Sequence, residues 1–225
     1  MTIPFANIPF LNKKIKFPVT PHIPGGLTTS HQLRQIAEIA DKYEGSLKIV
    51  GNTITIIGLN LSDGEKALAE LNCQGESFIA KAVRSVAFCP GKPDCPRALQ
   101  DSSSLGLALD KEFFGQELPG KLRIGVSGCP NCCIEPLVKD IGMYGTAKGY
   151  TLAVGGNSGF SAQIATVVAE KVPSEEISSI IKSILTFYRQ HGKSKERLGQ
   201  VITRIGWEQF INETIPTQYK KRLDL

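Results

Sequence analysis

The 225-residue sequence lacks long apolar runs and is poor in aromatic residues, which make up 7% of the chain. A membrane-spanning helix needs about 20 consecutive, mainly apolar residues, so no membrane association is expected. Proteins that bind single-stranded nucleic acids interleave aromatic side chains with Lys and Arg, and this chain has no such tract, so nucleic acid is not an expected partner. Phosphate-loop, flavin and nicotinamide motifs are missing too, which disfavours binding of those nucleotides.

No segment resembles a secretory signal peptide, and a chain of this length can bury a core without disulfides. Reduced cysteines are typical of the cytoplasm, where we expect the protein to be located. The net charge is +5, from 26 Lys and Arg against 21 Asp and Glu. This excess indicates either an ordinary solvated surface or a field that attracts anionic ligands.

Five of the six cysteines lie between Cys89 and Cys133, in two short clusters. A 4Fe-4S cluster needs four converging thiolates, and two Cys-bearing turns can supply two each. Structural zinc ligands usually stand about two to four residues apart, so the wider spacing of the first pair fits zinc poorly. Spacing alone leaves an iron-sulfur cluster, which it favours, a zinc site, and unrelated core thiols. The candidate cluster ligands are Cys89, Cys95, Cys129 and Cys133.

The sequence around both cysteine clusters resembles the siroheme-dependent sulfite and nitrite reductase family. The matching segments are Pro24–Thr29, Val83–Gly91, Val126–Cys133, Lys139–Gly142 and Gly155–Asn157. The resemblance implies a 4Fe-4S cluster held by the four cysteines, and a siroheme whose iron is bridged to the cluster by Cys133. Cys132 and Cys73 have no ligand role in this scheme and are expected to be small core or free thiols.

The implied activity is the six-electron reduction of sulfite to sulfide, with nitrite reduction as the alternative within the family. Because nucleotide-binding motifs are missing, the electrons would come from a separate ferredoxin-like donor. A third possibility is a siroheme and iron-sulfur electron carrier without catalysis of its own. Full-length assimilatory members contain two copies of the unit, whereas this chain has one and is similar to the low-molecular-weight sulfite reductases. A symmetric pair of chains would imitate the duplication, so we expect a homo-oligomer.

Several basic residues are candidates for binding anionic groups. Arg84, five residues before Cys89, is the first choice, both for pairing with a siroheme carboxylate and for the catalytic site. Arg97, two residues after Cys95, is also expected to contact the cofactor. Each has an ordinary surface cation as its alternative interpretation. Further cations near the cysteines are Lys92, Lys121 and Arg123.

His22 is the second catalytic candidate. Many larger family members place an arginine just before the Pro-Gly-Gly turn, where this chain has Thr20, Pro21 and His22. A histidine there can bind an anion and deliver protons near neutral pH, or it can be a turn residue hydrogen-bonded to the backbone.

A glycine-rich turn supplies the remaining candidates, Gly155, Gly156 and Asn157. Glycines let the backbone approach a large flat ligand closely, so we expect this turn to contact the cofactor. Glycine-rich hairpin turns would give the same pattern.

The expected fold is α+β: an N-terminal arm and ferredoxin-like domain over residues 1–79, then an α/β siroheme- and 4Fe-4S-binding domain with C-terminal helices over residues 80–225. In the first domain, hydrophobic periodicity and capping signals predict a strand, a helix, a hairpin, a helix and a strand. The first strand is expected over 16–20, the first helix over about 30–45, and the hairpin strands over 47–50 and 53–57. The second helix is expected to be capped by Ser62 and Glu65, and the last strand to span 78–88.

In the second domain the patterns predict a helix over 96–109, a strand over 122–126, a helix beginning within 134–139, strands over 141–144 and 151–154, and three helices after Pro173. The strand over 122–126 leads into the second cysteine cluster. Ligands gather at the carboxyl ends of strands in open α/β sheets, which suits a cofactor at that point.

Overall fold

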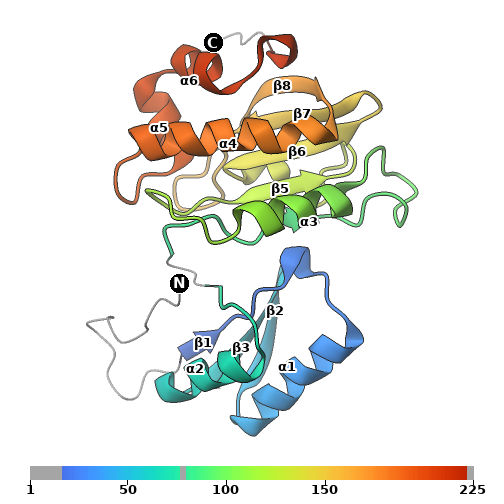
Figure 1. The fold of residues 1–225 in the computed structure, drawn as a ribbon, viewed down its shortest axis with the longest axis vertical. Helices are drawn as coiled ribbons and strands as arrows, with labels where there is room; N and C mark the ends of the chain where they lie inside the picture. The colour runs from blue at the N-terminus through green and yellow to red at the C-terminus, as the bar shows by residue number, and fades with distance from the viewer. Residues whose placement is uncertain (1–16, 77–79, 222–225) are drawn as a thin grey trace. The chain divides into compact units, whose positions relative to one another are not determined.

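The computed structural model describes residues 17–76 and 80–221, and the chain divides into two compact units, Met1–Phe78 and Ile79–Leu225 (Figure 1). Each unit has its own hydrophobic core. Among the described residues, no helix combines the length and the apolar character that crossing a membrane would require.

The first unit is a three-stranded antiparallel sheet with two helices. Its strands are β1 (Phe17–Val19), β2 (Ser46–Val50) and β3 (Thr53–Leu59), arranged in the order β1-β3-β2. The helices are α1 (Ser30–Lys42) and α2 (Leu61–Glu70). The predicted hairpin is confirmed, with Val50 paired to Thr53 across the turn. Apolar residues from all these elements except β2 form the core, which contains Val19, Ile23, Ile36, Ala40, Ile56, Leu59 and Ala67.

The two helices of this unit begin differently. Thr29 caps α1 by accepting a hydrogen bond from Gln32 N at 3.1 Å, and the Gln32 side chain returns to the Thr29 backbone at 3.2 Å. The prediction of a capping box at Ser62 was wrong. Helix α2 starts two residues earlier than predicted, at Leu61, so Ser62 lies inside its first turn, and its N-cap Asn60 makes no side-chain capping bond.

The second unit is built on a five-stranded mixed sheet in the order β4-β5-β6-β7-β8. The strands are β4 (Ala87–Phe88), β5 (Ile124–Ser127), β6 (Ile141–Thr146), β7 (Gly149–Val154) and β8 (Thr166–Val172). Strands β4, β5 and β6 run parallel, and β7 and β8 extend the sheet in antiparallel fashion. The parallel part requires crossover connections, and these connections carry the cysteines.

Helices pack on this sheet to form the main core. They are α3 (Ser102–Phe113), α4 (Ser174–His191), α5 (Leu198–Ile205) and α6 (Trp207–Thr214), with short 3₁₀ turns η3 (Pro136–Val138) and η4 (Thr217–Tyr219). Figure 1 shows α4 lying across the sheet and α3 beside β5. The inward face of α4 contributes Ile177, Ile180, Ile181, Ile184, Leu185, Phe187 and Tyr188, which are all fully buried.

The main differences from the expected elements in this unit are the following. The strand predicted over 78–88 is reduced to Ala87–Phe88 in the described part, where Ala82 and Val83 make only isolated bridges; residues 78 and 79 lie outside the described residues. The helix predicted from Pro96 begins at Ser102, because Asp101 caps it by accepting from Ser104 N at 3.0 Å. The helix expected within 134–139 is only the turn η3, and β8 was not predicted.

Candidate cofactor site

The two cysteine clusters are brought together by neighbouring parallel strands. Strand β4 ends one residue before Cys89, and β5 ends two residues before Cys129. The backbone N–H of Cys89 donates to Val126 O at 3.1 Å, and the N–H of Gly128 donates to Cys89 Sγ at 3.1 Å. Because these strands are parallel neighbours, their carboxyl ends place both cysteine turns at one edge of the sheet.

The loop after Cys89 packs directly on the turn that carries Cys129. Leu99 N and Gln100 N both donate to Gly128 O, at 2.8 and 3.0 Å, and Cys95 N donates to Gly91 O at 2.7 Å. A Cβ at Gly128 would stand 2.9 Å from Gln100 O and 3.1 Å from Gly91 Cα. Glycine at this position therefore lets the two cysteine turns touch.

The second turn presents its sulfurs unequally. Cys129 is buried, whereas Cys133 is exposed and accepts a hydrogen bond from Asn131 Nδ2 at 3.0 Å. Cys132 has a left-handed backbone with φ 51°, and its N–H donates to Cys129 O at 3.3 Å. In this turn Cys132 is half-buried and the neighbouring Cys133 is exposed.

The cysteines do not form a site for a single ion. Among the described residues, no three His, Cys, Asp or Glu side chains stand close enough together to hold one metal ion. A 4Fe-4S cube takes one thiolate at each of its four irons, so its ligands surround a larger body and lie farther apart than the ligands of a lone zinc. All six thiols are free, with no disulfide among them.

The surroundings fit a bound cofactor. Ser127, at the end of β5, is 1% exposed, and its Oγ has no hydrogen-bond partner within the described part of the chain. A buried hydroxyl without a partner is costly, and a bound group that accepts hydrogen bonds would satisfy it. Four thiols on two touching turns, beside an unsatisfied hydroxyl, suit the iron-sulfur cluster implied by the sequence.

Basic side chains gather near the amino end of β5. Burial lowers the pKa of Lys121, and the nearby Arg123, Arg197 and Arg84 lower it further, against the opposing effect of Asp140. Burial, followed by the charge of Arg123, likewise lowers the pKa of Lys139. Arg84 is 8% exposed, so it is not the ordinary surface cation of the alternative interpretation. We call Arg84, Lys121, Arg123, Lys139 and Arg197 the cation cluster.

A buried ion pair anchors this cluster. Arg197 donates from Nε to Asp140 Oδ1 at 3.0 Å and from Nη2 to Asp140 Oδ2 at 2.6 Å, and Arg123 N also donates to Asp140 Oδ2 at 2.7 Å. The Asp140 side chain is 1% exposed. Sequence reasoning identified Asp140 only as a matching residue and missed Arg197, because the two lie 57 positions apart and only the fold joins them.

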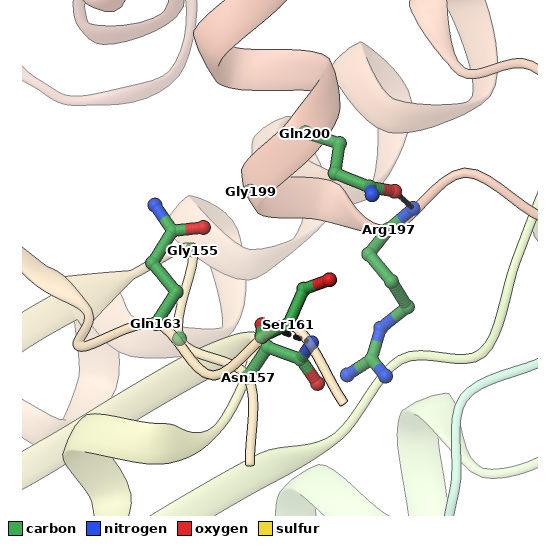
Figure 2. Close-up of a pocket in the computed structure, with 8 residues that line it drawn as sticks. Gly155, Asn157, Ser161, Gln163, Arg197, Gly199 and Gln200 are labelled. Atoms are coloured by element: carbon green, nitrogen blue, oxygen red, sulfur yellow. Dashed lines mark hydrogen bonds between the residues drawn. The ribbon is translucent and has the colours of Figure 1, made fainter. Parts of the chain in front are cut away.

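The predicted glycine turn lines a small cavity with Arg197 (Figure 2). Asn157 Nδ2 donates to Ser161 O at 2.8 Å, and Gly155 N donates to Asp140 O at 2.8 Å. A Cβ at Gly156 would stand 2.7 Å from Leu137 O, so the turn needs glycine to pack against its neighbours. The cavity of about 30 Å³ has room for about two waters and not for a tetrapyrrole.

Two further candidates are Arg97 and His22. Arg97 is exposed on the loop between Cys95 and α3. His22 belongs to the first unit, is half-buried, and its backbone N–H donates to Gln74 O at 2.8 Å. Its backbone bond agrees with the turn-residue interpretation, and the catalytic interpretation stays a prediction.

Family models match both units. Residues 79–223 match the "Nitrite and sulphite reductase 4Fe-4S domain", and residues 13–72 match the "Nitrite/Sulfite reductase ferredoxin-like half domain". The ferredoxin-like and α/β composition predicted from the sequence is confirmed. Two solved structures share the fold. Dissimilatory sulfite reductase I has a TM-score of 0.80 and 15% identity, and the match covers 93% of this chain and 72% of that one. Mycobacterium tuberculosis NirA has a TM-score of 0.76 and 18% identity, and the match covers 91% of this chain and 40% of that one.

Among curated relatives, an assimilatory-type sulfite reductase of Nitratidesulfovibrio vulgaris is 34% identical over 87% of this chain and 90% of its own length. A Bacillus subtilis nitrite reductase [NAD(P)H] is also 34% identical, over 89% of this chain but only 25% of its own length. The chain therefore belongs to the nitrite and sulfite reductase family and is an oxidoreductase whose cofactors are a 4Fe-4S cluster and siroheme.

Proposed function

We propose that the protein reduces sulfite to sulfide with six electrons, and that Cys89, Cys95, Cys129 and Cys133 hold its 4Fe-4S cluster. The observation that carries this choice is the extent of the alignment: the N. vulgaris relative named as a sulfite reductase aligns with this chain over 90% of its own length, at 34% identity. The chain covers 25% and 22% of the nitrite reductases of Bacillus subtilis and Escherichia coli.

The siroheme and cluster supply the one-electron chemistry and the metal that binds the substrate. The protein positions them. Cys133 is the exposed sulfur of the set, which suits a ligand shared between cluster and siroheme iron, whereas the buried Cys89 and Cys129 suit ligands that serve the cluster alone. Gly155, Gly156 and Asn157 shape the turn beside Arg197 and are proposed to support the cofactor site through this turn.

The cation cluster is proposed to bind the anionic groups. Sulfite and the siroheme carboxylates carry negative charge, and buried or half-buried guanidinium and ammonium groups attract and orient such groups strongly. Arg84, Lys121 and Arg123 are proposed as the anion-binding set. Arg84 and Arg123 lie close enough to Lys121 to lower its pKa, and Arg197, which does so too, holds Asp140. Arg97 is proposed as an outer contact to the cofactor, and His22 as a proton donor to the bound anion.

Nitrite is the second candidate substrate. The Bacillus subtilis relative named as a nitrite reductase reaches the same 34% identity as the sulfite reductase, so residue similarity does not separate the two anions. Both reactions would use every residue named above.

We also propose a separate ferredoxin-like donor, a homo-oligomer and a cytoplasmic location. A relative from Leptolyngbya laminosa is named ferredoxin–nitrite reductase, which supports the donor class. The six free thiols suit a reducing compartment. Sedimentation of the holoprotein would test the homo-oligomer.

The test is a viologen-driven assay of holoprotein made in a siroheme-competent host. We expect sulfide from sulfite, and loss of that activity in Arg84→Gln but not in Cys73→Ser, which alters a thiol of the first unit. Ammonia from nitrite with no sulfide from sulfite would reverse the order of the two substrates. Protein that is colourless when purified from that host, or that contains zinc, would overturn the proposal.

A further inference from the structure

Cys89 differs from the other candidate ligands in the number of donors around its sulfur. Its Sγ accepts from Gly128 N at 3.1 Å and lies 3.2 Å from Ser102 Oγ. Ser102 is fully buried, and it is the first residue of the twelve-residue helix α3. The sulfur thus lies beside a backbone N–H, a hydroxyl and the positive end of a helix.

The Ser102 hydroxyl has two acceptors within reach. It donates to Cys89 O at 2.8 Å, and either Ser102 Oγ or Cys89 Sγ could be the donor in the contact between them. When Cys89 is a metal-bound thiolate it has no hydrogen to give, so Ser102 is then the donor of any hydrogen bond between the two. A hydrogen bond to a charged acceptor is stronger than one to a neutral carbonyl.

The neighbouring Ser103 can replace Ser102 at the carbonyl. Its Oγ donates to Pro90 O at 2.5 Å and lies 3.4 Å from Cys89 O. Pro90 is exposed, so water can satisfy its carbonyl if Ser103 turns to Cys89. The loop therefore holds a second hydroxyl that frees Ser102 for the sulfur.

We infer that Ser102 sets the reduction potential of the iron-sulfur cluster by donating a hydrogen bond to the Cys89 thiolate. The inference rests on the proposed assignment of Cys89 as a cluster ligand. Reduction adds one negative charge to the cluster, and donors at a ligand sulfur stabilise that added charge, which raises the potential. Ser102 acts through the Cys89 sulfur in this scheme.

The test is a redox titration of holoprotein followed by electron paramagnetic resonance of the reduced cluster. Ser102→Ala removes only the hydroxyl and keeps a good helix former at the start of α3. We expect its ratio of oxidised to reduced cluster, at a fixed potential, to rise about tenfold, a fall in midpoint of about 59 mV for a one-electron couple. Ser103→Ala leaves Ser102 as the remaining hydroxyl for Cys89 O but keeps the hydroxyl beside the sulfur, so it should lower the midpoint by less than Ser102→Ala does.

Several outcomes would overturn the inference. An unchanged midpoint in Ser102→Ala with full cluster content would remove Ser102 from the site while leaving the proposed function intact. An equal shift in Ser103→Ala would show a general loop effect. If Ser102→Ala does not retain its cluster, the exchangeable-proton coupling of the reduced wild-type cluster decides: coupling to a hydroxyl proton in addition to an amide proton supports the inference, and an amide proton alone refutes it. Wild-type protein that is purified from a siroheme-competent host and contains no cluster would refute both this inference and the proposed function.

Discussion

Arg197 holds Asp140 through two hydrogen bonds, Nε to Oδ1 at 3.0 Å and Nη2 to Oδ2 at 2.6 Å, although 57 residues separate them. The pair ties the residue before α5 to the residue before β6. Asp140 also accepts from Arg123 N, so one buried carboxylate connects the C-terminal helices to the strand that leads to Cys129.

Asp140→Asn is expected to destabilise the protein by about 3–5 kcal/mol, because it leaves the half-buried Arg197 without its anionic partner. Chemical denaturation followed by circular dichroism measures the change. The matched control is Glu112→Gln at the Lys182–Glu112 ion pair, where Lys182 is 61% exposed; the expected loss there is about 0–1 kcal/mol. Equal losses would mean that the buried pair contributes no more than a surface pair.

Cys132→Gly should leave the cluster intact and raise the free energy of unfolding by about 1 kcal/mol, because φ 51° strains an L-residue and not glycine. Cys133→Ser, one residue away, should abolish magnetic coupling between cluster and siroheme. Iron and labile-sulfide analysis with electron paramagnetic resonance separates the two. Loss of the cluster in Cys132→Gly would move the ligand assignment to Cys132.

Lys121 should make anion binding sensitive to alkaline pH. Its pKa is lowered, first by burial and then by neighbouring arginines, so its charge is lost below the ordinary lysine range as pH rises. We expect sulfite affinity, measured by visible titration, to fall as the pH rises toward the ordinary lysine value of 10.5, and to fall less in Lys121→Arg, which stays charged. The same slope in both proteins would exclude Lys121 as the titrating group.

The lowered pKa of Lys121 also makes the free energy of unfolding depend on pH. Between the lowered pKa of folded Lys121 and the ordinary value of 10.5, the unfolded chain binds more protons than the folded one. The contribution of Lys121 to the free energy of unfolding therefore rises with pH across this window. Lys121→Gln should remove that slope in denaturation curves recorded at a series of pH values.

Gly128→Ala is expected to lower cluster content strongly, because its Cβ would push Gln100 O and Gly91 Cα apart from the Cys129 turn. Gly159→Ala is the control: its nearest neighbour is the Asn157 side chain at 3.2 Å, which can move. Iron analysis after purification measures both. Normal iron content in Gly128→Ala would show that the two cysteine turns need not touch.

Local patterns predicted the elements that local forces determine. The spacing of apolar residues in α4 identified an inward face that is fully buried, and the Val50–Thr53 hairpin followed from its Gly-Asn turn. Helix α3 begins later than expected because Leu99 and Gln100 are held on Gly128 O by backbone hydrogen bonds. The periodicity of apolar residues in the sequence gives no sign of these bonds.

The four candidate cysteine ligands and Arg84 could be named from the sequence because the motif concentrates them near one another, and their roles stay predictions. The Asp140–Arg197 pair, Lys139 and the Ser102 contact were not, since each depends on tertiary neighbours. A helix was expected within 134–139, where Glu135 instead adopts φ 54° and stops a regular helix from forming. Strand β8 was not predicted. Its pairing with β7 contains two register shifts, which interrupt the regular alternation of buried and exposed side chains that identifies a strand in a sequence.

The bonds that join the two cysteine turns, from Leu99 and Gln100 to Gly128 and from Cys89 to Val126, are made entirely by the polypeptide. We therefore expect these turns to stay paired when the cluster is absent, unlike those of a zinc finger, whose ligands assemble only as the metal arrives. Maturation would then consist of the insertion of a preassembled 4Fe-4S cluster into a folded polypeptide. A cell deficient in cluster delivery should accumulate this polypeptide in a compact, protease-resistant, inactive form that supplied iron and sulfide can rescue.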